Sequence, residues 1–122
     1  MPQGALIGCG FFAQNQLHAW GEISGAEIVA LCDRDEARLS ETAARFGIAR
    51  TYRDAGEMLA AEAIDFVDIA TTAPSHRPLV EMAARAGRHV ICQKPFAETM
   101  EDARAMVAAV EEAGYTLAGA PA

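Results

Sequence analysis

The sequence predicts an α/β fold in which one doubly wound parallel sheet carries helices on both faces. Short apolar runs alternate with amphipathic helical segments along all 122 residues. The apolar runs are nearly continuous, which is typical of parallel strands covered on both sides. A glycine-rich turn joins the first run to the first helix. Two βαβ halves that diverge from the first strand give the strand order 3-2-1-4-5-6, so we expect a Rossmann-type, three-layer α/β/α domain.

The apolar runs place the expected strands along the chain. They occupy Ala5–Gly8, Ala26–Asp33, Asp65–Thr72, Arg88–Lys94 and Tyr115–Ala120. A weaker strand at Arg50–Tyr52 and a short helix at Asp54–Ala61 fill the remaining interval. Because each crossover contains a helix, neighbouring strands are expected to run parallel.

Three of the connecting segments carry apolar residues at positions i, i+3, i+4 and i+7, the spacing of one helix face. Asp35 is expected to cap one helix, and Thr99 with Asp102 resembles a capping box at the start of another. Pro78 is expected in the first turn of its helix, where its missing N–H costs nothing. The stripes are Leu39, Thr42, Ala43 and Phe46; Leu79, Met82, Ala83 and Ala86; and Ala103, Met106, Val107 and Val110, and the glycines expected just after the helices are Gly47, Gly87 and Gly114.

Composition and charge exclude several classes of protein. The chain has 10 basic and 17 acidic residues and a net charge of −7, a balance that repels nucleic-acid phosphates and anionic membranes. No apolar run approaches the roughly 20 residues that cross a bilayer, so we expect a cytoplasmic protein with no nucleic-acid or membrane partner. Cys9, Cys32 and Cys92 have no metal-type spacing, and buried thiols are expected rather than a disulfide or a metal site.

The glycine-rich turn has the pattern G-x-G-x-x-A directly between a strand and a helix. Gly8 allows the tight turn, and Gly10 lets the main chain approach a pyrophosphate with no side chain in the way. Ala13 keeps the helix close to the sheet. The main-chain N–H groups of Phe11 and Phe12 are expected at the positive end of the helix, where they can bind phosphate. The turn therefore predicts a dinucleotide site.

An acidic residue stands where such a site requires one. Asp33 ends the second expected strand, about 20 residues after Ala13, and a carboxylate there accepts hydrogen bonds from the adenosine ribose hydroxyls and repels a 2′-phosphate. This favours NAD over NADP as the cofactor. Arg34 argues the other way, because its guanidinium can pair with a 2′-phosphate or stack on adenine, or it can simply face solvent. For the glycine loop as a whole, the alternative to a dinucleotide site is an incidental glycine turn in a flavodoxin-like or methyltransferase domain.

Two later segments carry a family resemblance. The strand "DIATT" leads into Pro74-Ser75-His76, and "AGRHVICQKPFAE" contains Lys94-Pro95. With the glycine loop and "LCDRD", these motifs are similar to the nucleotide-binding domain of the glucose-fructose oxidoreductase, inositol dehydrogenase and MocA family, over essentially the whole chain. Members usually carry Glu-Lys-Pro where this sequence has Gln93-Lys94-Pro95. Glutamine keeps the shape and hydrogen-bonding reach of glutamate but not its charge.

The resemblance implies a pyridine-nucleotide-dependent dehydrogenase, an enzyme that transfers hydride between nicotinamide and a sugar, a cyclitol or a related polyol. It implies that Lys94 lies beside the nicotinamide and the substrate hydroxyl, where it assists proton removal or holds the alkoxide as hydride leaves. Pro95 is then the residue that fixes the turn aiming this lysine. The other cofactor contacts implied, in the groove after the fourth strand and at this motif, are Thr71, Thr72, Pro74, His76 and Gln93.

The expected sheet supports Lys94 independently of the resemblance. It ends the fifth expected strand, at the carboxyl edge where open α/β sheets bind ligands. Burial in such a cleft lowers the pKa of a lysine and brings it nearer to a working proton acceptor; the alternative is a solvated lysine at a strand end. His76 is equally compatible with cofactor contact and with a structural role. His18 and His89 are expected to be packing or surface residues, and Trp20 to belong to the core.

Residues 1–122 are expected to form one domain, the cofactor half of a longer enzyme. Family dehydrogenases have a second, C-terminal domain that supplies the substrate pocket, and without it the chain is expected to be inactive. The expected partner is a small sugar or polyol, and homo-oligomerisation is left open. The alternative is a non-catalytic NAD-binding regulator. A short-chain dehydrogenase is excluded because it needs Tyr-x-x-x-Lys, and Tyr52 and Tyr115 are followed at that spacing by Gly56 and Gly119.

Overall fold

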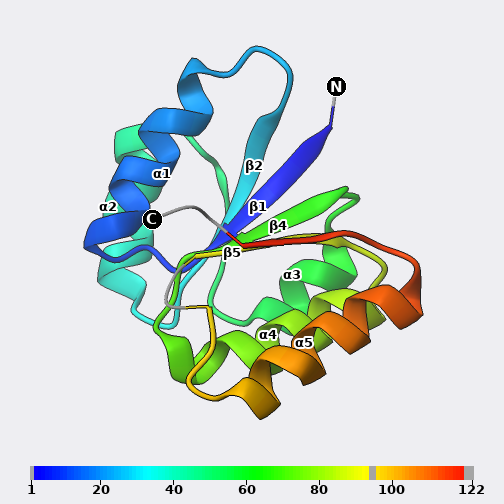
Figure 1. Cartoon of the computed structure of the whole chain (residues 1–122). Coiled ribbons are helices and arrows are strands. Elements are labelled where there is room, and N and C mark those ends of the chain that lie inside the picture. The colour runs from blue at the N-terminus through cyan, green and yellow to red at the C-terminus, as the bar shows by residue number, and fades with distance from the viewer. Residues whose placement is uncertain (1, 94–95, 120–122) are drawn as a thin grey trace.

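The computed structural model describes residues 2–93 and 96–119, without the side chains of residues 11 and 12. Within them, six strands form one parallel sheet in the order β3-β2-β1-β4-β5-β6 (Figure 1). This confirms the predicted fold class and strand order. Both βαβ halves start from the central strands β1 and β4, so the carboxyl ends of these two strands meet at the point where the direction of winding reverses.

The elements follow one another as strand and helix throughout. The strands are β1 (Gln3–Ile7), β2 (Glu27–Cys32), β3 (Arg50–Tyr52), β4 (Phe66–Ile69), β5 (His89–Cys92) and β6 (Leu117–Gly119). The helices are α1 (Phe11–Glu22), α2 (Glu36–Phe46), α3 (Ala55–Ala61), α4 (Ala73–Arg85) and α5 (Met100–Ala113). None of the helices in the described part of the chain is long and apolar enough to cross a membrane.

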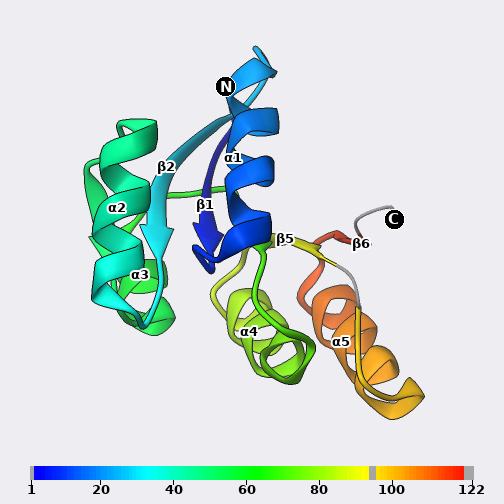
Figure 2. The same ribbon diagram turned by 90° about the vertical axis from the view of Figure 1, so that its left-hand side faces the viewer.

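The sheet separates two hydrophobic cores, because successive strand residues point to opposite faces. In β1, Leu6 packs with Leu17 of α1 and Leu39 of α2. Its neighbours Ala5 and Ile7 face the other side, in the larger core built with α3, α4 and α5. Figures 1 and 2 show this division, with α1 and α2 on one face and α4 and α5 on the other.

Most predicted helix ends are confirmed. The Asp35 side chain accepts a hydrogen bond from the main-chain N–H of Arg38 at 3.1 Å, and Thr99 Oγ1 accepts one from the N–H of Asp102 at 3.0 Å. The glycines predicted after the helices, Gly47, Gly87 and Gly114, all have a positive φ. These local signals predict correctly because each cap satisfies main-chain groups that the helix itself leaves unpaired.

The prediction for Pro78 is wrong. Helix α4 begins at Ala73, so Pro74 occupies its first turn and Pro78 lies inside the helix. Pro78 lacks the N–H that would bond the carbonyl of Pro74, but both prolines are exposed, so water can take that carbonyl. The earlier start also shortens the strand expected over Asp65–Thr72, which ends at Ile69.

Two predicted core residues lie elsewhere. Val107 is 39% exposed, although Met106 and Val110 of the same stripe are fully buried. Trp20 is half-buried at the end of α1, where its ring lies tilted on Phe66 with the ring centroids 5.0 Å apart. Its indole N–H faces a polar partner, as described below. A tryptophan in such a position needs that partner because its N–H cannot be left unpaired next to the sheet.

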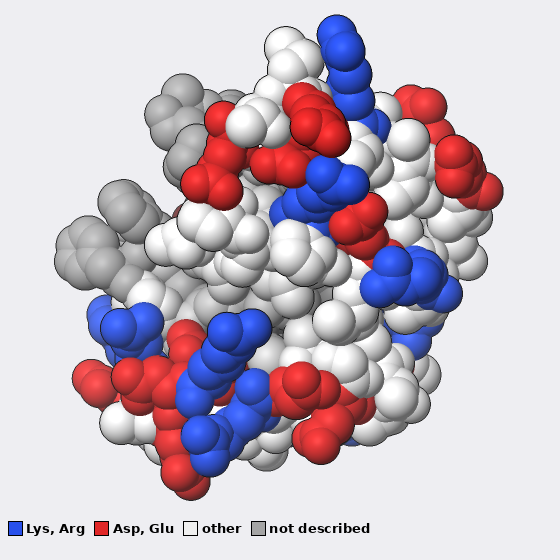
Figure 3. Space-filling view, turned by 90° about the horizontal axis from the view of Figure 1, so that it is seen from below, with Lys and Arg blue, Asp and Glu red and all other residues white. Residues whose placement is uncertain are grey.

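Charges on the surface are mixed in sign. On the face shown in Figure 3, basic and acidic side chains lie next to one another in groups around a largely uncharged central area. His18 and His89 are exposed, as predicted; His18 packs edge-on against Phe46, and His89 accepts a hydrogen bond from the N–H of Thr116.

Candidate nucleotide-binding site

The turn after β1 requires glycine at its first position. Gly8 has φ +100°, and a Cβ there would lie 2.9 Å from the carbonyl carbon and oxygen of Ala70. The Gly8 N–H donates to the carbonyl of Cys32 at 2.8 Å. Gly8 thus sits where the ends of β1, β2 and β4 meet, and both its conformation and its surroundings exclude a side chain.

The second glycine of the loop has a different reason to be there. Gly10 is extended, with φ −75° and ψ −169°, a conformation open to any residue. Among the side chains that the structure describes, a Cβ at this position would meet only the Arg38 guanidinium, at 3.9 Å. No described side chain caps α1, which begins at the next residue. The fold itself therefore gives no reason for a glycine at position 10, whereas close approach of a phosphate to the N-terminus of α1 gives one.

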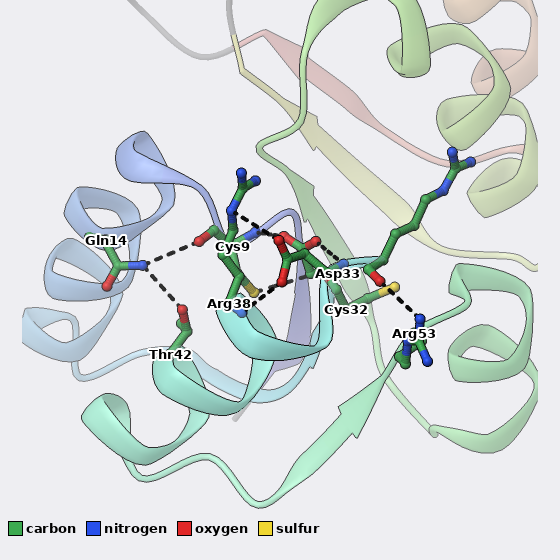
Figure 4. A network of polar contacts seen from close by, with 9 residues as sticks. Cys9, Gln14, Cys32, Asp33, Arg38, Thr42 and Arg53 are labelled. Carbon is green, nitrogen blue, oxygen red and sulfur yellow. Dashed lines mark hydrogen bonds and ion pairs between the residues drawn. The ribbon is translucent and has the colours of Figure 1, made fainter.

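Asp33 lies beside this loop and is held in one orientation. One carboxylate oxygen accepts a hydrogen bond from the N–H of Cys9 at 2.7 Å, and the other accepts one from the N–H of Asp35 at 2.8 Å. Figure 4 shows the carboxylate between the glycine loop and the start of α2. Each oxygen retains a further lone pair, so the group can still accept bonds from a pair of ribose hydroxyls.

The arginine nearest to Gly10 is one that the sequence analysis did not single out. Arg38, in the first turn of α2, directs its guanidinium toward the glycine loop (Figure 4). The side chain of Arg34 is exposed, and its carbonyl accepts a hydrogen bond from Arg53 at 3.4 Å. The capping role of Asp35 could have indicated Arg38, because side chains in the first turn of a helix lean toward its N-terminus.

The turn after β4 borders the same loop. The Thr71 methyl group lies 3.0 Å from the position of a Cβ on Gly8, and Thr71 Oγ1 accepts a hydrogen bond from the Ser75 hydroxyl at 2.6 Å. Thr72 and Pro74 are exposed at the start of α4. Of the predicted groove residues of this turn, Thr71 therefore adjoins the glycine loop, at the carboxyl edge of β1 and β4.

His76 lies beneath this turn. Its ring is 0% exposed, with Nε2 2.8 Å from the carbonyl oxygen of Thr71 and Nδ1 3.0 Å from that of Phe96. The ring links the segment after β4 to the segment after β5. Of its two predicted roles, this arrangement favours the structural one, because both ring nitrogens already face main-chain oxygens.

Lys94 and Pro95 lie outside the described residues, so only Gln93 of the motif can be placed. Its N–H donates to the carbonyl of Ile69 at 3.0 Å, which continues the pairing of β4 and β5 one residue beyond Cys92. Its side-chain N–H donates to Asp68 of β4 at 2.7 Å. Asp68 also accepts from the indole of Trp20 at 2.8 Å. No sequence pattern indicated this contact.

The cysteines are free and buried, as predicted. Burial raises the pKa of each of the three thiols to about 12. They are therefore neutral near pH 7, which excludes a thiolate nucleophile at these positions.

Asp68 gives the first prediction. Burial raises its pKa above 3.8, against the opposing effect of the two hydrogen bonds, and the nearby Cys92 thiol is neutral. Between pH 3.8 and the raised pKa, the folded chain binds more protons than the unfolded chain, so Asp68 makes the free energy of unfolding fall as pH rises. Asp68→Asn removes this effect. Urea unfolding from pH 4 to pH 7 should show the variant gaining stability relative to the wild type as pH rises; parallel curves would contradict the prediction.

Comparison with known proteins identifies the family. A family model described as "Oxidoreductase family, NAD-binding Rossmann fold" matches residues 3–119. The chain belongs to the glucose-fructose oxidoreductase, inositol dehydrogenase and MocA family. The resemblance drawn from the motifs is thereby confirmed, and the chain is a nucleotide-binding domain of an oxidoreductase family.

Similar members of the family are named dehydrogenases. A D-apiose dehydrogenase of Paraburkholderia graminis is 69% identical over 94% of this chain and 31% of its own length, and one of Rhizobium rhizogenes is 56% identical over 94% and 33%. An oxidoreductase from Agrobacterium radiobacter, solved with NAD⁺, L-tartaric acid and magnesium, has 55% identity and a TM-score of 0.95 over 97% of this chain and 34% of its own. The chain thus spans about a third of the length of these relatives.

Proposed function

We propose that this chain is the nucleotide-binding part of an NAD-dependent dehydrogenase that transfers hydride between nicotinamide and a sugar, a cyclitol or a related polyol. The observation that carries the proposal is that Gly10 and the Asp33 carboxylate lie next to each other at the glycine loop. Gly10 leaves the N-terminus of α1 open, and the Asp33 carboxylate is fixed beside it by the N–H of Cys9 at 2.7 Å.

The adenosine half of NAD fits this end of the sheet. The pyrophosphate would lie over Gly10, against the unpaired N–H groups that begin α1. Asp33 would accept the ribose hydroxyls, and Arg38 would lie on the same side of the phosphate as Gly10. From there the carboxyl edge of the sheet runs from β1 past Thr71, after β4, to the end of β5, so the nicotinamide half would lie toward Gln93, the residue before Lys94.

NAD, when bound, accepts the hydride. The protein must then hold the substrate carbinol against the nicotinamide and take its hydroxyl proton. Lys94 would accept that proton in its neutral form, and Pro95 would fix the direction of the lysine. The other two thirds of a protein as long as the relatives would supply the substrate pocket. Because two relatives are named D-apiose dehydrogenase, D-apiose is the first substrate to test.

The second prediction concerns the choice of cofactor. Fluorescence titration of the chain should show NADH binding at least about tenfold more tightly than NADPH, because the 2′-phosphate would meet the Asp33 carboxylate. Asp33→Ser should reduce this ratio. Asp35→Asn is the matched control: it removes a neighbouring negative charge, keeps a residue that caps α2 well, and should leave the ratio unchanged. Equal or tighter NADPH binding by the wild type would overturn the role of Asp33 and favour a phosphate contact from Arg34 or Arg38.

A further inference from the structure

Four polar side chains form a connected network on the α1 face of the sheet. Gln16 and Trp20 project from α1 and Asp68 from the middle of β4, and Gln93 directly follows β5. Gln16 donates to the side-chain carbonyl of Gln93 at 2.9 Å. Gln93 and Trp20 each donate to one oxygen of Asp68, at 2.7 and 2.8 Å.

The carboxyl group in this network is costly to bury. Asp68 is 1% exposed, and among the described residues no Lys, Arg or His forms an ion pair with it within 4.0 Å. Two neutral donors compensate only part of the cost of taking a carboxylate out of water. An apolar residue in the centre of β4 would serve the sheet better, so stability alone does not account for Asp68.

The network holds Gln93 at both its main chain and its side chain. Its N–H bonds the carbonyl of Ile69 at 3.0 Å, and its amide is engaged at the nitrogen by Asp68 and at the oxygen by Gln16. The amide nitrogen can only donate and the amide oxygen can only accept, so each end of the side chain has the partner that it needs. The residue directly before Lys94 is thus fixed in a single orientation.

We propose that Asp68 is a positioning residue that acts through Gln93 on Lys94. It rests on the proposed function, in which Lys94 handles the substrate proton. Where family members carry a glutamate before this lysine, the carboxylate here lies one strand away on β4, and Gln93 connects it to the motif.

The distances explain why position 93 holds glutamine rather than glutamate. A glutamate would bring a second carboxylate to within about 2.7 Å of Asp68, where the two cannot both be ionised. An amide at position 93 supplies the donor that Asp68 needs. Asp68 and Gln93 are therefore complementary, and each predicts the identity of the other.

A set of variants tests this complementarity through stability. Gln93→Glu should lower the Tm of the chain at pH 7 by about 10 °C, because a half-buried carboxylate then faces the buried carboxylate of Asp68. In the double variant Asp68→Asn, Gln93→Glu, the amide donor stands at position 68 and the carboxylate at position 93. This variant should recover most of the lost Tm. If the double variant melts no higher than Gln93→Glu, the two side chains are not a complementary pair.

The positioning role is tested at Lys94 itself. Lys94 is the only lysine in the sequence, so lysine labelled with ¹³C at Cε gives one side-chain NMR signal whose titration reports on this residue alone. Without nucleotide, Asp68→Asn should lower the midpoint of that titration by roughly half a pH unit, because the variant removes the negative charge bound to Gln93, the residue directly before Lys94 in the sequence. The double variant should restore it.

Asp65→Asn is the matched control, with the same substitution at an exposed carboxylate at the opposite end of β4. It should leave the Lys94 signal unchanged. An unmoved signal in Asp68→Asn, or an equal shift in the control, would overturn the positioning role. Because no nucleotide or substrate is present, neither outcome depends on whether Lys94 is catalytic, and the dehydrogenase proposal keeps its own tests.

Discussion

Gly10→Val should abolish NADH binding while the chain stays folded. The extended conformation of Gly10 suits a β-branched residue, and within the described part of the chain a Cβ there meets only the exposed guanidinium of Arg38, at 3.9 Å. With nucleotide present, the same side chain occupies the space that the pyrophosphate needs, and the phosphate loses its approach to the start of α1. We expect the affinity to fall at least about a hundredfold, or roughly 2.7 kcal/mol, in a calorimetric titration.

Gly8→Ala separates the two roles of the loop. At φ +100°, with main-chain atoms 2.9 Å from the new Cβ, this change should destabilise the fold by about 2–4 kcal/mol. The two glycines thus predict opposite patterns: position 10 affects binding and position 8 affects stability. Undiminished NADH affinity in a folded Gly10→Val variant would show that the loop serves only the turn.

Lys94→Met should lower kcat by about 10²–10⁴, the usual contribution of a general acid–base group. Methionine retains the length of the side chain and removes the amine, so NADH affinity should change little. The measurement is steady-state kinetics with D-apiose in an active protein that carries this chain together with a substrate domain. Positioning of the substrate against nicotinamide can supply roughly 7–11 kcal/mol of the barrier in such reactions, and a protein of the relatives' length is therefore the one to assay.

The experiment is informative because it measures the effect on kcat and the effect on NADH affinity separately. Lys94→Arg is the control for charge, because it keeps a cation but cannot give up its proton in a protein. It should resemble Lys94→Met in kcat. An unaltered kcat in Lys94→Met would remove the lysine from the chemistry, and a recovered kcat in Lys94→Arg would reduce its role to that of a positive charge.

The order of the strands, the caps and the glycine loop could all be predicted because their signals are local. Gly8 and Gly10 stand between a strand and a helix, and Asp35 precedes a helix whose N–H groups need an acceptor. The carboxylate of Asp33 could be assigned because the end of β2 meets the loop in any sheet with β1 next to β2. These inferences needed only the strand order.

The network of Asp68 could not be predicted, because its members come from three elements and no spacing along the chain connects them. The position of Pro78 in its helix was predicted wrongly for a related reason. A proline suggests the first turn of a helix, but His76 itself lies in the first turn of α4, where its buried ring has its two nitrogens 2.8 and 3.0 Å from the carbonyl oxygens of Thr71 and Phe96. This buried ring requires the helix to begin before it, and a tertiary contact therefore outweighs the local preference of proline.

The central claim is that NAD lies across the carboxyl edge of the sheet with its nicotinamide at Lys94. The sole lysine makes this directly measurable, by mass spectrometry of the chain after reaction with an amine-acetylating reagent. NADH should protect Lys94 from acetylation, whereas ADP-ribose, which occupies the same loop without a nicotinamide, should leave it reactive; Gly10→Val should abolish the protection. Equal acetylation of Lys94 with and without saturating NADH would contradict the account.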